Sequence, residues 1–597
     1  MKMIQRVNKV QQLMQAKHYD LYLVPSSDPH DNEYVPTCWQ RRHWVSGFDG
    51  SAGEVVITQQ VNFLWTDGRY TTQAKQQLDS TCFQVKPQSG FTSEFEGWFQ
   101  ENGQGKTLAI DPATISIYRA QNLIKIANDI GAKIVFDPIN LVDQVRQTVD
   151  PDALVMPLSS VMIQATQYTG ASVDQKLSQV RFKMQQNQAD QLVVTLLDEI
   201  AWLLNIRGQD IDFNPLVISY VIVTMTNCYL YIDQTKVSKE VKQYFHDNKI
   251  ELMPYESFIQ TLEQQSHQVL WIDTNKANYR IFQALQSNIT CIEKPTPIGL
   301  FKAIKNATEL EGMQTVHCQD AVAMMRFMHW LEHHWQSGVS ELDAVEQLYQ
   351  FRSQQAGFQS NSFSMISSFG ANGAIIHYSP TPETNQIITD KNLYLFDSGG
   401  QYLQGTTDVT RVIHLGQPTA EQKMYYTLVL KGHLALRHTP FTKGTCGEHL
   451  DALARQPLWQ QCINYAHGTG HGVGSFLCVH EGPQKISPAI SHQPLQPGMI
   501  VSNEPGIYFP DHYGIRIENL CQITQIATNS GPTQQDFYQL QDLTLVPYAL
   551  DLIDVTLLTH NEINQINMYH DQIRKYILPK LPSELTQWAM EKVQPIG

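Results

Sequence analysis

The stretch YLFDSGGQYLQGTTDVTRV, residues Tyr394–Val412, sets two aspartates at the two ends of a predicted hairpin. The apolar run Leu393–Phe396 is typical of a β-strand and ends at Asp397, and Asp408 opens a second such run, Val409–Ile413. The glycines between the two runs supply the backbone conformations that turns require. The sequence therefore predicts that the hairpin brings the two carboxylates close together.

Two neighbouring carboxylates repel each other unless a cation lies between them or one of them keeps its proton. The pair Asp397 and Asp408 therefore indicates a metal site or a protonated carboxyl group. An ordinary solvated turn, rich in aspartate and glycine, fits this stretch equally well. The rest of the chain has to decide between these interpretations.

The composition is that of a soluble protein with several domains. At 597 residues the chain is too long for a single hydrophobic core, and about three to four domains are expected. Hydrophobic residues make up 42% of the chain and charged residues 17%. The net charge of −15 argues against non-specific binding of nucleic acid, although carboxylates bound to metal could account for part of it.

No segment predicts export or membrane insertion. Residues 1–25 predict an amphipathic helix and a short strand, without the apolar core of a signal peptide. The longest weakly polar run, Leu216–Ile232, contains several hydroxyl side chains and stops at Asp233, which favours two buried strands over a membrane span. The nine cysteines are odd in number and form no Cys-x-x-Cys pair, so we expect reduced thiols and a cytoplasmic protein.

The first 300 residues predict the same α/β unit twice. Matching strand-like runs adjoin six aspartates in the same order, Asp20, Asp67 and Asp111 in the first copy and Asp190, Asp233 and Asp273 in the second. The repeat is too long for a solenoid and indicates two sister domains. We predict domains over 1–152 and 153–301, followed by a third over 302–597. The second copy lacks the polar cluster Ser46–Gly53, so only the first is expected to contribute side chains to a shared site.

A different pattern begins near residue 300. Thr308 stands three residues before Glu311, which is the spacing of a helix-capping box, and a long helix is expected to follow through His334. From there to about residue 560 the chain alternates helices with glycine-bounded strands and contains every strong chemical motif. We therefore expect the catalytic domain in this third part.

Three histidines follow the aspartate pair. His467 and His471 lie in AHGTGHGVG, whose four glycines let the backbone pass close to a ligand and disfavour a regular helix. A phosphate-binding loop is the alternative, but the Lys-Ser/Thr ending of such a loop is absent. His480 follows in VHEGP.

Two more carboxylates follow in strand contexts. Glu504 lies at the turn after one predicted strand, and Arg516 and Glu518 share one face of another, with Ile515 and Ile517 on the opposite face. For Arg516 a plain structural ion pair is the alternative role.

These residues together suit two metal ions. Four negative charges come from Asp397, Asp408, Glu504 and Glu518, and His471 adds a neutral nitrogen. Two divalent cations balance four charges, and such ligands suit Mn²⁺, Co²⁺, Fe²⁺ or Zn²⁺ better than a thiolate site does. Two ions about 3.5–4 Å apart can share a water, lower its pKa and direct the hydroxide at a carbonyl carbon. The sequence therefore indicates hydrolysis.

Taken together, these motifs resemble the long, three-domain aminopeptidase P (Xaa-Pro aminopeptidase) family, metallopeptidases with the pita-bread catalytic fold. The resemblance runs nearly end to end. It is carried by FDSGG, GTTDVTR, HGTGHGVG, VHEGP, NEPG and GIRIEN, at 396–400, 405–411, 467–474, 479–483, 503–506 and 514–519. Outside the site, 198–208 and 569–588 match the second domain and the C-terminal tail of the long form.

The resemblance implies a set of functional residues. It makes five residues ligands of two divalent ions, most simply Mn²⁺, with Zn²⁺ or Co²⁺ as alternatives: Asp397, Asp408, His471, Glu504 and Glu518. His377, in IHYSP, matches an active-site histidine, as do His467 and His480, for each of which a surface or core histidine is the usual alternative. Residues 41–51 and 67–70 resemble a segment that faces the site across domains or subunits, which makes Arg69 a substrate-binding candidate. A homodimer is also implied.

The implied reaction releases the N-terminal residue from peptides with proline at the second position. As a hypothesis, hydroxide attacks the first carbonyl with Glu504 as general base, and the three histidines bind substrate and stabilise the oxyanion. The substrate amino group lies near Asp397, and Arg516 orients a carboxylate or a polar neighbour. The proton for the leaving nitrogen comes from Glu504 or from a histidine.

Two alternatives remain at this point. A prolidase, which cleaves Xaa-Pro dipeptides, uses the same ligands, but the extra middle domain and the long tail argue against it. A non-enzymatic peptide-binding relative usually lacks ligands, and all five are present here.

Overall fold

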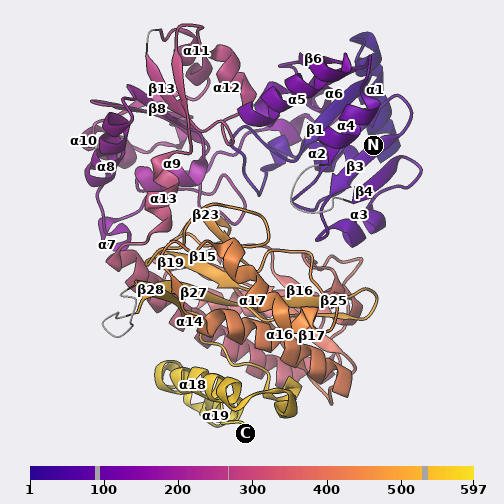
Figure 1. Ribbon diagram of the computed structural model, residues 1–597, viewed down its shortest axis with the longest axis vertical. Coiled ribbons are helices and arrows are strands. Elements are labelled where there is room, and N and C mark those ends of the chain that lie inside the picture. Colours follow the sequence, from indigo (N-terminus) through magenta and orange to yellow (C-terminus); the bar gives the residue numbers. More distant parts are fainter. Residues whose placement is uncertain (88–93, 267, 527–534) are drawn as a thin grey trace. The chain divides into compact units, whose positions relative to one another are not determined.

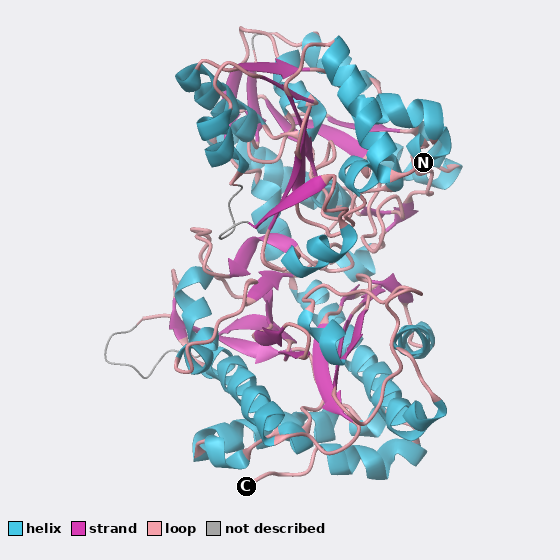
Figure 2. Ribbon diagram, turned by 90° about the vertical axis from the view of Figure 1, so that its right-hand side faces the viewer, coloured by secondary structure: helices cyan, strands magenta, loops and turns pink. Residues whose placement is uncertain are grey.

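The computed structural model describes residues 1–87, 94–266, 268–526 and 535–597 (Figure 1). They form two compact units, one made of Met1–Thr166 with Ala171–Gly299 and the other of Gln167–Gly170 with Leu300–Gly597. In each unit, helices pack beside the strands (Figure 2). None of the helices among the described residues combines the length and the hydropathy needed to cross a bilayer.

The first half of unit 1 is built on a six-stranded sheet of order β4-β3-β2-β1-β5-β6. Its strands are β1 Leu21–Pro25, β2 Glu54–Thr58, β3 Asn62–Thr66, β4 Phe83–Pro87, β5 Thr107–Ile110 and β6 Lys133–Phe136. Its helices are α1 Met3–Ala16, α2 Arg41–Ser46, α3 Thr71–Gln77, α4 Phe95–Asn102, α5 Ile117–Ile130 and α6 Leu141–Val149. Separate hydrophobic clusters include alternate residues of β1, Tyr22 and Val24 in one and Leu21 and Leu23 in the other, because successive side chains of a strand point to opposite faces.

The second half of unit 1 repeats this sheet with the order β12-β11-β10-β8-β13-β14. Its strands, with the small pair β7 and β9, are β7 Met162–Ile163, β8 Gln191–Val194, β9 Ile206–Arg207, β10 Ser219–Thr224, β11 Cys228–Ile232, β12 Ile250–Pro254, β13 Val269–Ile272 and β14 Thr290–Glu293. Its helices are α8 Val173–Gln186, α9 Leu197–Leu203, α10 Lys239–Asp247, α11 Ser257–Glu263 and α12 Tyr279–Ala284. Most of α7, Thr166–Thr169, belongs to unit 2, and α13, Pro297–Ala303, begins in unit 1 and ends in unit 2.

The predicted duplication is confirmed, because corresponding strands of the two sheets pair in the same sense. β1 is antiparallel to β2 and parallel to β5, just as β8 is antiparallel to β10 and parallel to β13. The weakly polar run at 216–232 forms the buried strands β10 and β11, as predicted.

Unit 2 contains three small sheets and one six-stranded sheet, of order β21-β28-β27-β24-β22-β23, among the described residues. Its strands are β15 Phe358–Asn361, β16 Ile366–Phe369, β17 Leu393–Ser398, β18 Gly400–Tyr402, β19 Gly405–Thr406, β20 Val409–His414, β21 Phe441–Thr442, β22 Gly470–Gly472, β23 Glu481–Ile486, β24 Ile500–Asn503, β25 Gly506–Phe509, β26 Tyr513–Arg516, β27 Asn519–Gln525 and β28 Phe537–Asp542. Its helices are α14 Ala307–His334, α15 Glu341–Ser353, α16 Ala420–His438, α17 Gly447–Trp459, α18 His560–Tyr576 and α19 Thr586–Lys592.

The C-terminal helices belong to the main hydrophobic core of unit 2. Residues of α18 and α19 share one buried cluster with residues of α14, α16, β17 and β20. Figure 1 shows α18 and α19, in yellow, alongside this part of the unit. The tail is therefore an integral part of the fold.

The N-cap of the long helix α14 lies two residues before the predicted cap. Asn306 is the N-cap, and its capping-box partner is Glu309, so the prediction of Thr308 with Glu311 was wrong. Both pairs have the required spacing, but Asn306 also donates a hydrogen bond to the carbonyl of Thr169, and the preceding Lys305 is tied to Glu481. These tertiary contacts place the start of the helix.

Candidate metal centre

The predicted aspartate pair lies at the two ends of the connection between the neighbouring strands β17 and β20 of one sheet. Asp397 is in β17 opposite Thr410 of β20, and Asp408 directly precedes β20. One oxygen each of Asp397, Asp408 and Glu518 lie within 4.8 Å of one another. The expectation that the two aspartates meet is confirmed, but the connection is not a simple turn, because β18 and β19 pair with each other and β18 pairs with β15.

Gly399 makes this connection possible. A Cβ atom at this position would lie 1.9 Å from the carbonyl oxygen of Thr407, closer than any side chain allows. The close approach of the two chain segments therefore requires glycine here.

His471, Glu504 and Glu518 form a second group of donor atoms within 4.8 Å of one another. His471 is in β22, Glu504 follows β24, and Glu518 lies between β26 and β27. Nε2 of His471 is 3.5 Å from Oδ2 of Asp408 and 3.6 Å from Oε1 of Glu504. The two groups share Glu518, so all five expected ligands gather in one place.

Arg516 and Glu518 both reach this site, while Ile515 and Ile517 enter the hydrophobic core, as the period-two pattern predicts. The strand itself ends at Arg516, so the prediction of one strand through Glu518 was wrong. The backbone N–H of Glu518 instead donates to the carbonyl of Thr410, 3.2 Å away.

The electrostatics of the cluster call for a positive charge. Burial, with a smaller contribution from Asp408, raises the pKa of Asp397 to about 7 against the lowering effect of nearby Arg516. Burial also raises the pKa values of Glu504 and Glu518, and neighbouring carboxylates add to the effect. Burial lowers the pKa of His471, but Asp408 and Glu504 outweigh it, and the pKa rises to about 9. Each of these shifts reduces net negative charge in the site.

Two buried oxygens point to the same need. Oδ1 of Asp397 and Oδ1 of Asp408 accept no hydrogen bond from the described residues. A buried acceptor without a donor costs about 1–3 kcal/mol, and more when it is charged. A cation is the partner that would satisfy both oxygens.

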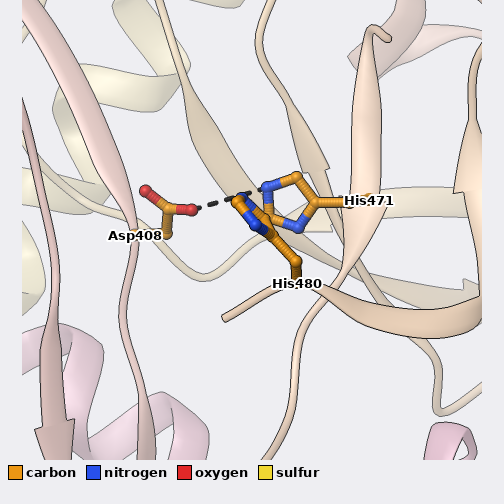
Figure 3. Close-up of side chains that lie close together, drawn as sticks. All are labelled: Asp408, His471 and His480. Atoms are coloured by element: carbon orange, nitrogen blue, oxygen red, sulfur yellow. Dashed lines mark ion pairs between the residues drawn. The ribbon is translucent and has the colours of Figure 1, made fainter. Parts of the chain in front are cut away.

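His480 lies beside the ligand groups. One donor atom each of Asp408, His471 and His480 lie within 4.8 Å of one another, and the two imidazole rings meet at 85° with centroids 4.4 Å apart (Figure 3). The resemblance made His480 an active-site histidine, and its position at the edge of the donor cluster agrees with that role.

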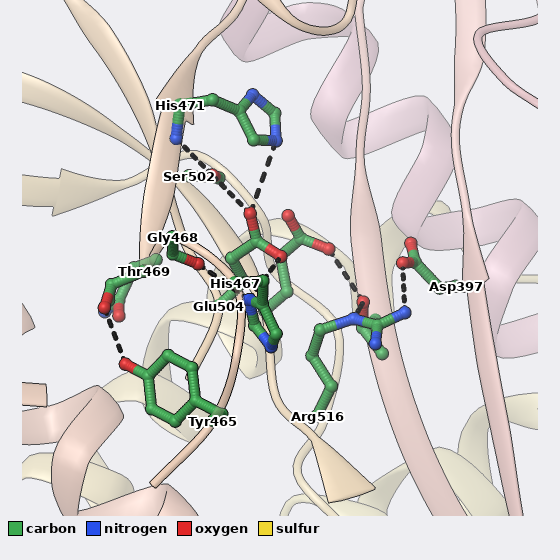
Figure 4. Close-up of polar contacts among 12 residues, drawn as sticks. Asp397, Tyr465, His467, Gly468, Thr469, His471, Ser502, Glu504 and Arg516 are labelled. Atoms are coloured by element: carbon green, nitrogen blue, oxygen red, sulfur yellow. Dashed lines mark hydrogen bonds and ion pairs between the residues drawn. The ribbon is translucent and has the colours of Figure 1, made fainter. Parts of the chain in front are cut away.

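Arg516 connects the metal cluster to His467 through a tyrosine. Its Nη2 donates to Oδ2 of Asp397 at 2.6 Å, its Nη1 donates to the hydroxyl of Tyr508 at 2.7 Å, and its Nε donates to the hydroxyl of Thr410 at 3.1 Å. The hydroxyl of Tyr508 is also 2.9 Å from Nε2 of His467. Nδ1 of the His467 ring is 3.9 Å from Oε2 of Glu504 (Figure 4). The bond to Asp397 is thus an ion pair within the site. Tyr508 was not predicted from the sequence. It follows the Asn-Glu-Pro-Gly motif and stands two residues after Gly506, a spacing that would place it on the same strand face as Gly506.

The loop that carries His467 is held by one guanidinium. Arg455 of α17 is buried and uses each of its five N–H groups, and it lies 3.8 Å from the centroid of the Tyr465 ring. The acceptors are both carboxylate oxygens of Asp451, the side-chain oxygen of Asn464, and the carbonyls of Tyr465 and His467.

Thr469 extends this support to Glu504. Its hydroxyl lies 2.6 Å from the hydroxyl of Tyr465 (Figure 4) and donates to Oδ1 of Asp451 at 2.6 Å. Its carbonyl accepts from the backbone N–H of Glu504 at 2.8 Å. Neither Asp451 nor Arg455 was predicted as a functional residue, because an i, i+4 ion pair on a helix is most often structural.

A second buried charge cluster adjoins His480. Glu481, the next residue, opens β23 and pairs with Lys302 at 2.9 Å and Lys305 at 2.5 Å, all three side chains being almost fully buried. These ion pairs connect β23, the strand after His480, to the segment just before α14 in unit 2.

The contacts described above do not decide the roles of two predicted residues, His377 and Arg69. His377 is half-buried in the turn after the 3₁₀ segment Gly370–Ala374, and the three donor groups found among the described residues do not include it. In unit 1, Arg69 donates to both oxygens of Asp67 at 2.9 and 2.7 Å. Their roles in substrate binding stay predictions.

Comparison with known families identifies four successive segments. Residues 6–148 and 152–309 each match a creatinase/prolidase N-terminal domain, residues 311–525 match metallopeptidase family M24, and residues 536–596 match the C-terminal region of that peptidase family. The two N-terminal matches coincide with the two sister sheets.

Relatives match over the whole length. A probable Xaa-Pro aminopeptidase P of Sordaria macrospora is 41% identical over 99% of both chains, and Xaa-Pro aminopeptidase 1 of Dictyostelium discoideum is 40% identical over 99% of this chain and 96% of that protein. A crystal structure of X-prolyl aminopeptidase from Caenorhabditis elegans, described as a cytosolic enzyme with a di-nuclear active site, matches all of both chains with a TM-score of 0.94 and 32% identity. The chain therefore belongs to metallopeptidase family M24, among the long, three-domain Xaa-Pro aminopeptidases.

Proposed function

We propose that this protein is a metal-dependent aminopeptidase that releases the N-terminal residue from peptides whose second residue is proline. The observation that carries the proposal is the convergence of Asp397, Asp408, His471, Glu504 and Glu518 in two donor groups that share Glu518. The names of the full-length relatives support the substrate class.

The five residues fit two divalent ions. They offer four carboxylates and one imidazole, three of the carboxylates are buried, and two buried oxygens have no hydrogen-bond donors among the described residues. Oxygen donors with one imidazole suit Mn²⁺, which we propose as the native metal, with Zn²⁺ and Co²⁺ as the alternatives. Bound there, two divalent ions supply Lewis-acid polarisation of the substrate carbonyl and a more acidic water at neutral pH.

Glu504 is the proposed general base. Its carboxylate lies between His471 at 3.6 Å and His467 at 3.9 Å, and its backbone N–H is fixed by the carbonyl of Thr469. Burial raises the pKa of Glu504, and a raised pKa makes a carboxylate a better proton acceptor. Glu504 can therefore take the proton of the attacking water and pass it, directly or through a histidine, to the leaving nitrogen.

The proposed substrate contacts surround this base. Asp397, held by Arg516, binds the substrate amino group and limits the enzyme to the first residue of a peptide. His467, oriented by Tyr508, stabilises the oxyanion together with His480 and His377. Arg516 acts by positioning Asp397 and Tyr508, and we retain Arg69 as a substrate-binding candidate.

Proline at the second position fits a site that reads the amine and the carbonyl. The bond before proline is a tertiary amide without an N–H, so a peptidase that needs this donor fails on it. None of the proposed contacts requires that N–H. Proline is therefore acceptable at the second position of the substrate. The names of the relatives support a preference of this enzyme for proline there.

The deciding experiment compares Xaa-Pro dipeptides with longer Xaa-Pro-Xaa peptides, with Mn²⁺, Zn²⁺ or Co²⁺ added to the metal-free protein. We expect cleavage of the longer peptides, with the highest turnover in Mn²⁺. Activity on dipeptides alone would make the protein a prolidase. A folded protein that binds peptide, binds no metal and cleaves no peptide would instead be a non-enzymatic binding relative.

Three further features are proposed with this function. We propose a cytoplasmic location and a homodimer without nucleic-acid or membrane partners, supported by the cytosolic C. elegans relative and by the family resemblance. Analytical ultracentrifugation tests the dimer. We also propose domain boundaries at 1–152, 153–301 and 302–597, which limited proteolysis tests.

A further inference from the structure

Arg411 joins the metal centre to a part of the chain that the proposed reaction does not use. It lies in β20 opposite Phe396, whereas its neighbour Thr410 lies opposite Asp397, so the guanidinium extends from the strand face away from the metal cluster. It is buried, with 1% of its surface exposed. Its hydrogen bonds run in two directions, toward the ligand strands and toward the C-terminal region.

Toward the site, Arg411 holds backbone carbonyls. Its Nη1 donates to the carbonyl of Glu518 at 2.7 Å and to that of Thr410 at 2.8 Å, and its Nη2 donates to the side-chain oxygen of Asn519 at 2.7 Å. The hydroxyl of Thr410 in turn donates to Oε2 of Glu518 at 2.7 Å. Both the backbone and the carboxylate of Glu518, the residue common to the two donor groups, are therefore held in place.

Toward the tail, Arg411 contacts residues of the segment 536–596 that matches the C-terminal region of the family. It donates to the carbonyls of Val546 at 2.8 Å and Pro547 at 3.1 Å and to the hydroxyl of Tyr569 in α18 at 3.0 Å. The Tyr569 hydroxyl also accepts from the backbone N–H of Val546 at 3.1 Å and lies 2.9 Å from its carbonyl. This phenol uses both its donor and its acceptor capacity.

The six acceptors of Arg411 are uncharged groups: four carbonyls, one amide and one phenol. An arginine placed only to neutralise charge would be bonded to a carboxylate. Because a planar guanidinium fixes several acceptors in one geometry, this arrangement instead serves to align backbone segments.

A second route leads from the same tail to Glu504. The ring of Tyr548 stacks on Tyr569 with centroids 4.5 Å apart, and its hydroxyl lies 3.1 Å from Nε2 of His433. Nδ1 of His433 lies 3.1 Å from the carbonyl of Asn503, whose side chain donates back to the carbonyl of His433 at 2.9 Å. Asn503 directly precedes Glu504, so the tail reaches two of the five proposed ligands.

We propose that the C-terminal region is a positioning element of the metal centre, acting through Arg411 on Glu518 and through Tyr548 and His433 on the backbone before Glu504. The proposal rests on the proposed metal-dependent function. It gives the tail a task beyond packing, which is to keep the carboxylates at a separation that two divalent ions can bridge.

The test measures ion binding in three full-length variants. Arg411→Lys keeps the charge but loses the fork of donors, and Tyr569→Phe keeps the ring packing but loses the hydroxyl. Tyr576→Phe removes the hydroxyl of a tyrosine on the same helix that is 45% exposed, and it is the matched control. Mn²⁺ affinity is measured by competition with a chromophoric chelator, bound ions are counted by mass spectrometry, and circular dichroism checks the fold.

We expect Arg411→Lys and Tyr569→Phe to weaken Mn²⁺ binding by about 10- to 100-fold, as removal of an outer partner of a metal ligand commonly does. Excess Mn²⁺ should restore both the ion count and the peptidase activity, and Tyr576→Phe should match the unsubstituted protein. If Arg411→Lys does not fold, Tyr569→Phe decides the question.

Unchanged Mn²⁺ affinity in a folded Tyr569→Phe protein, even with a lower Tm, would overturn the proposal and leave the tail a packing role. Ion binding is read separately from peptide cleavage. A protein that binds two ions and cleaves no Xaa-Pro peptide contradicts the proposed function, while the affinity ratio of the variants still supports or overturns the role of the tail.

Discussion

Replacing Arg455 by Met tests whether a buried ion pair on α17 positions His467. The substitution keeps the apolar stem but removes five hydrogen bonds and the contact with Tyr465. Asp451, which is 3% exposed, then keeps only the hydroxyl of Thr469 as a partner among these contacts. Removing one partner of a buried pair leaves an uncompensated charge and costs about 3–5 kcal/mol. At about 2 °C per kcal/mol for a unit of this size, the Tm of the catalytic unit should fall by about 6–10 °C.

The kinetic effect should fall on kcat. Freed from Arg455, the carbonyls of Tyr465 and His467 no longer fix the loop, and a displacement of about 1 Å in a catalytic group costs up to about 100-fold in rate. The ion count should not change, because the backbone of His471 is held separately by the hydroxyl of Ser502. Calorimetry, steady-state kinetics at a temperature well below the Tm, and metal analysis of the same samples measure the three effects.

The double variant Asp451→Asn with Arg455→Met is the control for the buried charge. It should recover about 2 kcal/mol of the lost stability, because no carboxylate remains buried without a partner. It should not recover kcat, because the His467 loop is still released. Wild-type kcat in Arg455→Met would refute the positioning role, and an unchanged Tm would refute the desolvation argument.

Three further outcomes follow from the site. Chelation should lower the Tm, and added Mn²⁺ should restore it. In the metal-free protein the free energy of unfolding should fall as pH rises from about 4 to about 7, because the folded state keeps a proton on Asp397 that the unfolded chain has released. A Tm that rises with pH over this range would contradict this reasoning. Asp408→Asn should reduce the number of bound ions and lower turnover by orders of magnitude with an unchanged circular dichroism spectrum, and full activity would overturn its assignment as a ligand. Glu481→Gln leaves the buried ammonium groups of Lys302 and Lys305 without a carboxylate, so the free energy of unfolding measured by denaturant titration should fall by about 3–5 kcal/mol. An unchanged midpoint would show that these ion pairs do not stabilise the fold.

Much of the fold follows from local patterns. Apolar runs mark β17, β20, β10 and β11, and the repeated strand–aspartate pattern predicts two sister domains, whose sheets share one strand order in the structure. These features depend on side-chain periodicity and turn residues within a few positions of each other. They are therefore visible in one sequence without an alignment.

The errors arose where distant contacts choose between local options. The pairs Asn306 with Glu309 and Thr308 with Glu311 have the same capping spacing. The contact that favours Asn306 is its hydrogen bond to Thr169, which lies more than a hundred positions away in the chain. The strand containing Arg516 ends there because the backbone of Glu518 turns to pair with Thr410. Periodicity carries no information about such partners.

The five donors show the same division. The sequence by itself determined which residues could bind two cations, because carboxylates and an imidazole in glycine-rich and strand contexts are chemically suited to that task. Only the tertiary structure decided that Tyr508 links Arg516 to His467, that Arg455 holds the loop of His467, and that Tyr569 reaches Arg411 across 158 positions of the chain. A hydrogen bond depends on the positions of two atoms in space, and for residues this far apart those positions are set by the packing of the whole unit.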